Sequence, residues 1–380
     1  MKLIHLSDLH LGKRLNEQSL IEDQKYILDK ILEIIDVEKT DGVIIAGDVY
    51  DKSVPSQEAV VLFDDFLTKL AKRMLQVFVI SGNHDSPERM SFGSKLMDQS
   101  GVHISQVYDG KLTPYVLSDE HGEMCIYLLP FVKPANVRRF FDDEINSYTD
   151  AIKVAISKAE IDTDKRNILV THQFVTGASR SESEEISVGG TDNVDASVFD
   201  AFDYVALGHI HSPQNCGSEK IRYCGTPLKY SFSEAKDNKS VTIIEFKEKS
   251  NMQIRVIPLV PLHDLVEIKG TFDEVMSKSF YENTTYQTDY VRITLTDEDD
   301  IIDAIGKLRS VYYNLMRLDY DNKRTRGVSE ITDADVEEKS PFELFCQLYE
   351  NQNNQPMSSE QESFLKKLIE EIWEGEEWNL

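Results

Sequence analysis

Five short apolar segments, each followed by side chains that can bind a metal, constrain the fold of this chain most strongly. The clearest covers residues 43–46 and continues into Gly47 and Asp48. An apolar run of this length indicates a buried strand, and glycine lets the backbone turn so that the aspartate points into an open site. One such run alone is typical of an ordinary strand-to-turn junction, so the argument depends on its recurrence.

The other four segments end in the same way. Residues two apart in an extended chain face the same side, so Asp8 with His10, and His209 with His211, can each converge on one point. A single histidine here could be an ordinary hydrogen-bonded turn residue, but five of the nine histidines of the chain fall at these endings, which predicts one common site. The endings carry Asp8 and His10 after residues 3–6, Asn83 and His84 after residues 75–81, His172 after residues 168–170, and His209 and His211 after residues 205–207.

Strands and helices alternate along the first 81 residues. This alternation predicts an α/β sheet, whose ligands bind beyond the carboxyl ends of the strands. Three later segments are expected to form antiparallel strands that complete a second sheet, namely residues 221–223, 241–246 and 253–257. The early elements are expected at residues 2–7 (strand), 19–37 (helix), 43–46 (strand), 55–73 (helix) and 75–81 (strand).

Pro258 and Pro261 mark a domain boundary. Beyond them, residues 263–318 show a strand, helix, strand, helix, strand pattern, which predicts a small separate domain. Apolar faces on two later helical stretches, in residues 341–373, need a surface to cover them. The predicted domains are residues 1–258, which carry the site, 259–325, a small α/β domain, 326–339, an acidic linker, and 340–380, a helical partner-binding tail.

The composition excludes several classes of protein. No apolar run reaches membrane-spanning length, and the first residues run directly into a strand without room for a signal peptide, so we expect a cytoplasmic protein with no membrane contact. The four cysteines show no C-x-x-C spacing, which argues against a disulfide framework or a zinc knuckle. A net charge of −26 argues against strong DNA binding by this chain alone.

The candidate ligands are two carboxylates, one amide oxygen and several imidazoles, with no thiolate. Oxygen and nitrogen ligands of this kind suit manganese or iron, and zinc is possible. Two such ions a few ångströms apart can activate a water and neutralise the charge that develops at phosphorus. The pattern therefore indicates phosphoester hydrolysis.

The same residues carry a family resemblance. Asp8-x-His10, Gly47-Asp48, Gly82-Asn83-His84-Asp85, Thr171-His172 and Gly208-His209-Ile210-His211 resemble the motifs of the calcineurin-like metallophosphoesterases. Residues 6–12, 46–51, 80–86 and 223–228 are similar to a narrower family, the nuclease subunits of the bacterial SbcCD exonuclease, and this similarity runs over nearly the whole chain.

This resemblance implies a fold, a ligand set and one catalytic residue. The fold would be an α/β four-layer αββα sandwich with a small α/β capping domain and a helical C-terminal tail. His84 would be a non-ligand that stabilises the transition state or protonates the leaving oxygen. Two manganese ions are implied, with other divalent metals possible, one held by Asp8, His10, Asp48 and His211 and the other by Asp48, Asn83, His172 and His209.

The resemblance also implies a function and partners. The chain would be the nuclease subunit of an ATP-dependent DNA exonuclease and endonuclease complex, a 3'-5' double-strand exonuclease and single-strand endonuclease. It would process DNA ends and hairpins in repair, recombination and replication, with an SbcC-type coiled-coil ATPase as partner and a homodimer through the nuclease domain. Asp51 stands where archaeal and eukaryotic relatives carry a histidine, so a second catalytic imidazole is not expected.

Two other functions remain open from the sequence. The first is a phosphatase or small-nucleotide phosphodiesterase of the same superfamily. Against a protein phosphatase, the stretch Gly47-Asp48-Val49-Tyr50-Asp51-Lys52 lacks the Arg-Gly that would follow. The second is a non-catalytic scaffold, which the complete ligand set disfavours because buried carboxylates and histidines without ions are costly. The tail likewise has two readings, docking on the ATPase or packing back onto the nuclease body.

Overall fold

The computed structural model describes residues 1–16, 18–179, 192–323, 325, 340–353 and 355–374. The chain divides into two compact units, Met1–Asp264 and Leu265–Leu380. The predicted acidic linker at residues 326–339 lies outside the described residues. No helix in the described ranges is long and apolar enough to cross a membrane.

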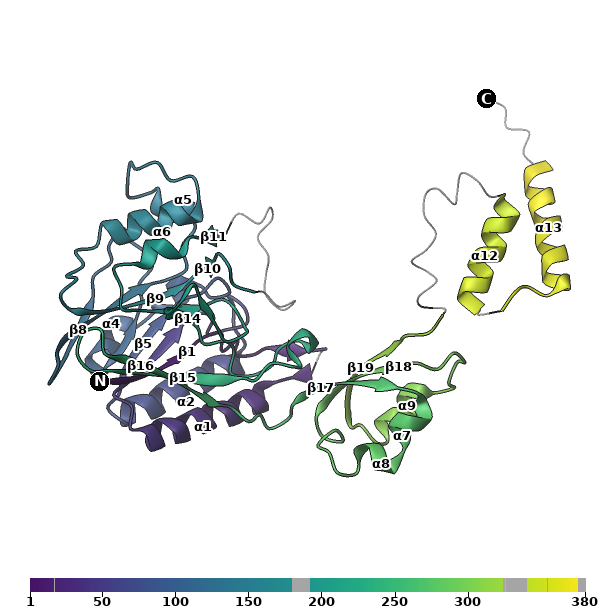
Figure 1. Ribbon diagram of the computed structural model, residues 1–380, viewed down its shortest axis with the longest axis horizontal. Coiled ribbons are helices and arrows are strands. Elements are labelled where there is room, and N and C mark those ends of the chain that lie inside the picture. The colour runs from purple at the N-terminus through teal and green to yellow at the C-terminus, as the bar shows by residue number, and fades with distance from the viewer. Residues whose placement is uncertain (17, 180–191, 324, 326–339, 354, 375–380) are drawn as a thin grey trace. The chain divides into compact units, whose positions relative to one another are not determined.

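Two six-stranded mixed sheets form the centre of the first unit (Figure 1). In the first sheet, β1, β4, β5 and β6 are parallel, β15 pairs antiparallel with β1, and β16 pairs antiparallel with β15. In the second sheet, four parallel strands are flanked on each edge by an antiparallel one. In spatial order, the first sheet contains β16 (Met252–Pro258), β15 (Ser240–Phe246), β1 (Lys2–Leu6), β4 (Gly42–Ala46), β5 (Gln76–Ile80) and β6 (Val102–Ile104). The second contains β13 (Gln214–Cys216), β14 (Ser218–Tyr223), β12 (Tyr204–Gly208), β9 (Arg166–His172), β8 (Gly122–Leu129) and β7 (Tyr115–Asp119).

Helices cover the outer face of each sheet. Figure 1 shows α1 (Ile21–Glu38) and α2 (Gln57–Lys72) on one side, and α5 (Pro134–Val137) and α6 (Tyr148–Ser157) on the other. The Ser56 side chain caps α2 by accepting from the Ala59 N–H. The shorter elements are α3 (Pro87–Met90), α4 (Ser94–Met97), the 3₁₀ turns η1 (Asp98–Ser100), η2 (Ala196–Phe199) and η3 (Phe232–Glu234), and the strand pairs β2 (Arg14–Leu15) with β3 (Gln18–Ser19) and β10 (Phe174–Val175) with β11 (Asn193–Val194).

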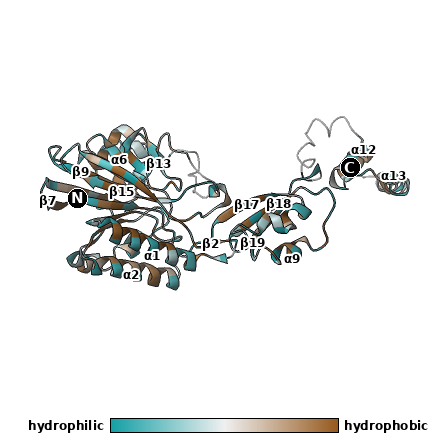
Figure 2. Ribbon diagram, turned by 60° about the horizontal axis from the view of Figure 1, so that its bottom comes forward, coloured by the Kyte–Doolittle hydropathy of each residue, from teal (hydrophilic) through white to brown (hydrophobic). Residues whose placement is uncertain are grey.

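Alternating side chains build two of the apolar layers between these elements. Ile44 and Phe78 of the first sheet pack with Ile168 of the second to fill the space between the sheets. Residues on the other face of the second sheet, such as Leu169, pack with Ile152 of α6. In Figure 2 the hydrophobic colour gathers in the strands between the helix layers. The fold is therefore the expected four-layer α/β sandwich, because the central strands, such as β4, β9 and β12, are buried on both faces.

One part of the predicted topology is wrong. The segments expected at residues 241–246 and 253–257 are antiparallel strands, but they extend the first sheet, where β15 pairs with β1. Only β14 joins the second sheet. Leu3 lies opposite Ile244 in this pairing. The alternation within a strand does not say which sheet edge it extends, so the sequence could not distinguish the two placements.

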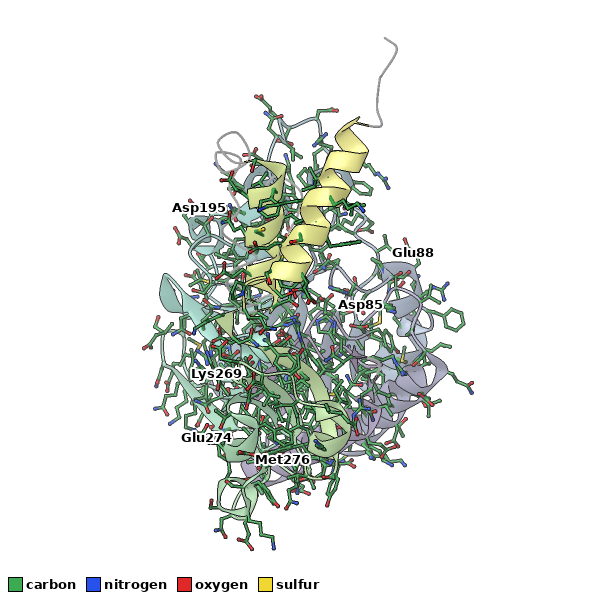
Figure 3. All side chains as sticks on the ribbon, turned by 90° about the vertical axis from the view of Figure 1, so that its right-hand side faces the viewer. Asp85, Glu88, Asp195, Lys269, Glu274 and Met276 are labelled. Carbon is green, nitrogen blue, oxygen red and sulfur yellow. The ribbon has the colours of Figure 1, made fainter. Side chains whose placement is uncertain are left out.

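The second unit begins with a three-stranded parallel sheet in the order β17, β18, β19. Its core includes Ile293 and Tyr312, whose hydroxyl donates to the carbonyl of Val275 at 2.6 Å. The predicted strand and helix pattern is confirmed, and the Asp303 side chain caps the last helix by accepting from the N–H of Gly306. The elements are β17 (Leu265–Gly270), α7 (Phe272–Met276), α8 (Lys278–Tyr281), β18 (Tyr290–Leu295), α9 (Ala304–Arg309) and β19 (Asn314–Tyr320). Lys269, Glu274 and Met276 of this sheet-and-helix part are labelled in Figure 3.

The tail contains two helices, as predicted, α12 (Pro341–Asn353) and α13 (Ser359–Glu374). Phe345, Tyr349, Phe364 and Leu368 line a groove of about 450 Å³ along the pair. Phe364 is 69% exposed, so the helix pair by itself does not cover this apolar face. The side chains of Ile372 and Trp373, which we expected on the same face, lie outside the described ones.

Candidate active site

All eight predicted site residues come from the carboxyl ends of neighbouring strands. β1, β4 and β5 adjoin in the first sheet, and β9 and β12 adjoin in the second. Because parallel strands end at the same edge, their following loops meet there. The residues are Asp8 and His10 after β1, Asp48 after β4, Asn83 and His84 after β5, His172 at the end of β9, and His209 and His211 after β12.

The first cluster consists of Asp8, His10 and His211, whose potential ligand atoms all lie within 4.8 Å of one another. All three side chains are buried. The Nε2 atoms of His10 and His211 are 3.2 Å apart and face each other. Asp8 is held in place by the N–H of His209, at 3.1 Å from each carboxylate oxygen, and by the Ser7 hydroxyl at 2.5 Å. Two imidazoles and a carboxylate directed at one point form a donor set that fits a divalent cation.

The second cluster is arranged around Asn83 and Asp48. The Asn83 side-chain oxygen lies 3.0 Å from Nε2 of His172 and 2.9 Å from Nδ1 of His209. Nε2 of His172 is also 3.3 Å from Oδ2 of Asp48. Nδ1 of His172 donates to the carbonyl of Ala46 at 2.8 Å. With that hydrogen on Nδ1, Nε2 faces two oxygens, an arrangement that requires a cation at this point, either a proton or a metal ion.

The pKa values of the site residues also indicate that a positive charge is stabilised here. Burial alone would lower the pKa of His172, but the Asp48 and Asp8 carboxylates raise it to about 9. Burial would raise the pKa of Asp48, yet His172, His10 and His84 together hold it below its ordinary value. Burial raises the pKa of Asp8 to about 6. Without a metal, a proton on His172 therefore balances the Asp48 carboxylate.

Asp48 lies between the two clusters. Its Oδ2 is 3.3 Å from Nε2 of His172 and 3.8 Å from Nε2 of His10. Its Oδ1 accepts the backbone N–H of His84 at 2.9 Å. Asp48 therefore faces imidazoles of both clusters at the shortest distances, while Oδ1 of Asp8 lies 4.0 Å from Nε2 of His172.

The backbone at the site is held in the left-handed region. Gly47 has φ of +88°, as the sharp turn requires, and four of the predicted ligands also have positive φ: Asp8 at 52°, His10 at 42°, Asp48 at 48° and His209 at 103°. Non-glycine residues in sparsely populated backbone regions cost on the order of 1–3 kcal/mol each and persist only where the surroundings impose them. Such strain gathered at one place is typical of a functional site.

The two sheets touch at this edge. A Cβ added to Gly208, at the end of β12, would lie 1.9 Å from the carbonyl oxygen of Ala46, at the end of β4. Any side chain at residue 208 would therefore push the sheets apart. This contact lets the imidazoles of the second sheet reach the carboxylates of the first.

Three residues that hold the ligand loops had no predicted role. Asp85 accepts the N–H groups of Val49, Tyr50 and Gly82 at 3.1, 2.9 and 2.9 Å, which fixes the loops that carry Asp48 and Asn83. It is labelled in Figure 3.

Gln24 and Tyr230 hold the loop after β1. The Gln24 amide donates to the carbonyl of His10 at 2.7 Å, and the Tyr230 hydroxyl donates to the carbonyl of Leu9 at 2.5 Å. Asp85 was visible in its motif, but Gln24 and Tyr230 carry no signal in the sequence.

His84 borders the clusters and is partly open to solvent, with 17% of its side chain exposed. Its Nδ1 lies 3.1 Å from the backbone carbonyl of Asp51, to which it donates, and this leaves Nε2 directed toward Oδ2 of Asp48 at 3.9 Å. His84 also forms a possible ligand group with His10 and Asp48. The Asp51 carboxylate pairs with Lys13 at 2.8 Å.

Comparisons with known proteins show which family this chain resembles. A family model described as calcineurin-like phosphoesterase matches residues 1–213, and one described as type 5 capsule protein repressor C-terminal domain matches residues 261–353. The D subunit of nuclease SbcCD from Staphylococcus epidermidis is 32% identical over 99% of this chain and 100% of its own length. The D subunit of nuclease SbcCD from Staphylococcus saprophyticus is 36% identical over 84% of each chain. Among solved structures, TT1561 of Thermus thermophilus is 12% identical, covering 67% of this chain and 98% of its own, with a TM-score of 0.39.

The two-sheet fold and its cluster of aspartates, asparagine and histidines define a calcineurin-like phosphoesterase, a class of metal-dependent phosphoesterases. Within that class, the chain belongs to the family of the D subunit of nuclease SbcCD.

Proposed function

We propose that this chain is the nuclease subunit of an ATP-dependent DNA exonuclease and endonuclease complex. It hydrolyses DNA phosphodiester bonds at double-strand ends and hairpins, in the cytoplasm, during repair, recombination and replication. The observation that carries this proposal is the position of Asp48, which faces one imidazole of each ligand cluster. A carboxylate in that position suits two ions that act on one phosphate.

We assign the two metal positions to the two clusters. Manganese suits both sets, because imidazole and amide donors fit it better than magnesium. The fit rests on the facing nitrogens of His10 and His211 and on the two oxygens that face His172. One position would be held by Asp8, His10, Asp48 and His211, and the other by Asp48, Asn83, His172 and His209.

The protein groups supply the rest of the chemistry. Bound metal ions provide Lewis acidity and lower the pKa of a coordinated water. Asp85, Gln24 and Tyr230 keep the ligand loops in place, so little reorganisation is needed during the reaction. His84 is the partly exposed imidazole at the edge of the site, and we assign it the transfer of a proton to the leaving oxygen.

We also propose two protein partners. The name of the relatives implies a second subunit, which we take to be a coiled-coil ATPase, and the apolar groove of α12 and α13 would dock on it. The exposed apolar residues near α2, α3 and α4 would pair two copies of the chain; they include Val54, Val61, Phe92 and Leu96, which are 64%, 60%, 85% and 76% exposed. A net charge of −26 means that the partner would supply much of the attraction for DNA.

One assay distinguishes a nuclease from a small-molecule phosphodiesterase and from a scaffold. The full chain, with and without the ATPase, is given linear duplex DNA or a chromogenic phosphodiester, each with and without manganese. We expect manganese-dependent cleavage of the chromogenic compound by the chain alone, and ATP-dependent cleavage of duplex DNA by the complex. Cleavage of the small compound without DNA cleavage by the complex would favour the phosphodiesterase, and no cleavage of either would favour the scaffold.

A further inference from the structure

A buried ion pair lies directly behind His211. Glu234, the last residue of η3, is 0% exposed, and Lys239 is 5% exposed. Nζ of Lys239 lies 2.6 Å from Oε2 of Glu234. Removing two charges from water is expensive, and a buried pair is often no more stabilising than apolar residues of the same volume. Its location beside a candidate metal ligand therefore needs an explanation other than stability.

The pair holds both the ring and the backbone of His211. Oε1 of Glu234 lies 3.4 Å from Nδ1 of the His211 ring. The ammonium of Lys239 donates to the His211 carbonyl at 3.0 Å, and the Thr226 N–H donates to the same oxygen at 3.0 Å. The Thr226 hydroxyl donates to the carbonyl of Leu228 at 2.6 Å and lies 3.4 Å from Oε2 of Glu234. These contacts leave the ring little freedom to turn.

The charge on Glu234 determines which ring nitrogen carries the hydrogen. An ionised carboxylate can only accept, so Nδ1 of His211 must be the donor. The Lys239 ammonium stabilises the ionised form of Glu234. The lone pair of His211 is then on Nε2, which faces Nε2 of His10 at 3.2 Å. A carboxylate behind an imidazole also makes the far nitrogen a stronger base.

In the second cluster, the ring of His172 does not donate to a carboxylate in this way. His172 donates from Nδ1 to the neutral carbonyl of Ala46 and not to a charged group. His172 and His211 are therefore both fixed with the hydrogen on Nδ1, but only His211 receives electron density from an anion. The two metal positions differ in this respect.

We propose that Glu234 is a positioning residue that fixes the His211 tautomer and strengthens His211 as a ligand, so that it tightens one of the two metal positions and not the other. This inference rests on the ligand assignment proposed above. Lys239 offsets the charge of Glu234 and also pairs with the Asp237 carboxylate at 3.2 Å.

The test is a manganese titration of the full-length metal-free chain by calorimetry. Wild type should bind two ions. Glu234→Gln should weaken one of them about 10- to 100-fold and leave the other unchanged, the usual effect of removing such an outer partner. Glu234→Asp, which keeps the charge, should recover part of the loss. The matched control is Asp119→Asn, which removes a carboxylate paired with Arg166 at 2.6 Å and should change neither ion.

A second measurement separates positioning from a merely structural role. In chains labelled with ¹⁵N only at histidine, and without metal, His211 should show its hydrogen on Nδ1. Glu234→Gln offers an amide that can donate, so the hydrogen should shift toward Nε2. If Glu234→Gln unfolds, Glu234→Gln combined with Lys239→Met removes both charges and takes its place in both measurements.

The outcomes keep this inference distinct from the proposed function. Wild-type manganese affinities in the folded variant, or an unchanged His211 tautomer, would overturn the role of Glu234 and leave the nuclease assignment intact. A wild-type chain that binds no manganese would overturn the metal assignment, and with it the effect of Glu234 on metal affinity.

Discussion

The backbone N–H of His84 donates to Oδ1 of Asp48 at 2.9 Å. A main-chain group makes this bond, so the position of the carboxylate does not depend on the imidazole of His84. The ring can therefore be removed without losing the bond, which makes the proposed acid separable from the proposed metal site.

We expect His84→Ala to keep both metal ions and to lose a factor of about 10² to 10⁴ in rate, as removal of a general acid typically does. The measurements are metal content by mass spectrometry and cleavage of a chromogenic phosphodiester. Loss of one ion in this variant would instead make His84 a ligand, a role that its proximity to His10 and Asp48 permits.

Activity should vanish when a chelator removes divalent ions and should return with manganese to a higher level than with magnesium. Magnesium prefers oxygen ligands and keeps its waters, whereas the two clusters supply several imidazoles. The check is an add-back series on chelated protein at fixed ionic strength. Equal rescue by magnesium, or full activity in chelator, would contradict the proposed ligand set.

Deleting residues 340–380 should abolish co-purification with the ATPase subunit and leave cleavage of a small phosphodiester largely unchanged. The apolar groove along α12 and α13 is the proposed docking surface. Phe364→Glu in the full chain is a milder test, because this residue is 69% exposed and its replacement leaves the fold of the first unit untouched. Retained binding by both variants would place the ATPase contact elsewhere.

His5 should make the first unit less stable in mild acid. It is buried beside the Tyr204 hydroxyl, 3.0 Å from Nδ1, and burial with help from Arg222 lowers its pKa to about 3. Between that value and the unfolded pKa of about 6.5, only the unfolded chain takes up the proton, so stability falls as the pH falls. Between pH 7 and 5 this effect is worth about 2 kcal/mol.

Urea unfolding at several pH values tests this contribution. His5→Gln should flatten the dependence by about that amount over the same range, whatever its effect on stability at pH 7. His121→Gln, which removes a histidine whose side chain is 23% exposed, is the control. A slope unchanged in His5→Gln would show that another group titrates.

The position of the candidate ligands at one sheet edge could be predicted from the sequence because each follows directly on an apolar strand, so a local pattern marks both the strand and its ending. The sheet that β15 and β16 join could not be predicted, since either sheet offered an edge. Gln24 could not be found either, because it lies on a helix as an ordinary polar residue and meets the carbonyl of His10 only in the folded chain. The contact between Glu234 and His211 could not be predicted, because no periodic sequence pattern indicates it.

The close approach of Gly208 to Ala46 has a consequence for how the chain folds. These residues end strands of different sheets, and the candidate ligands are divided in the same way, with Asp8, His10, Asp48 and Asn83 following the first sheet and His172, His209 and His211 belonging to the second. A folding intermediate with only one sheet in place holds four or three of these seven candidate ligands. Tight metal binding should therefore appear only when the two sheets dock, and the rate at which a refolding chain captures manganese should measure that last step of assembly.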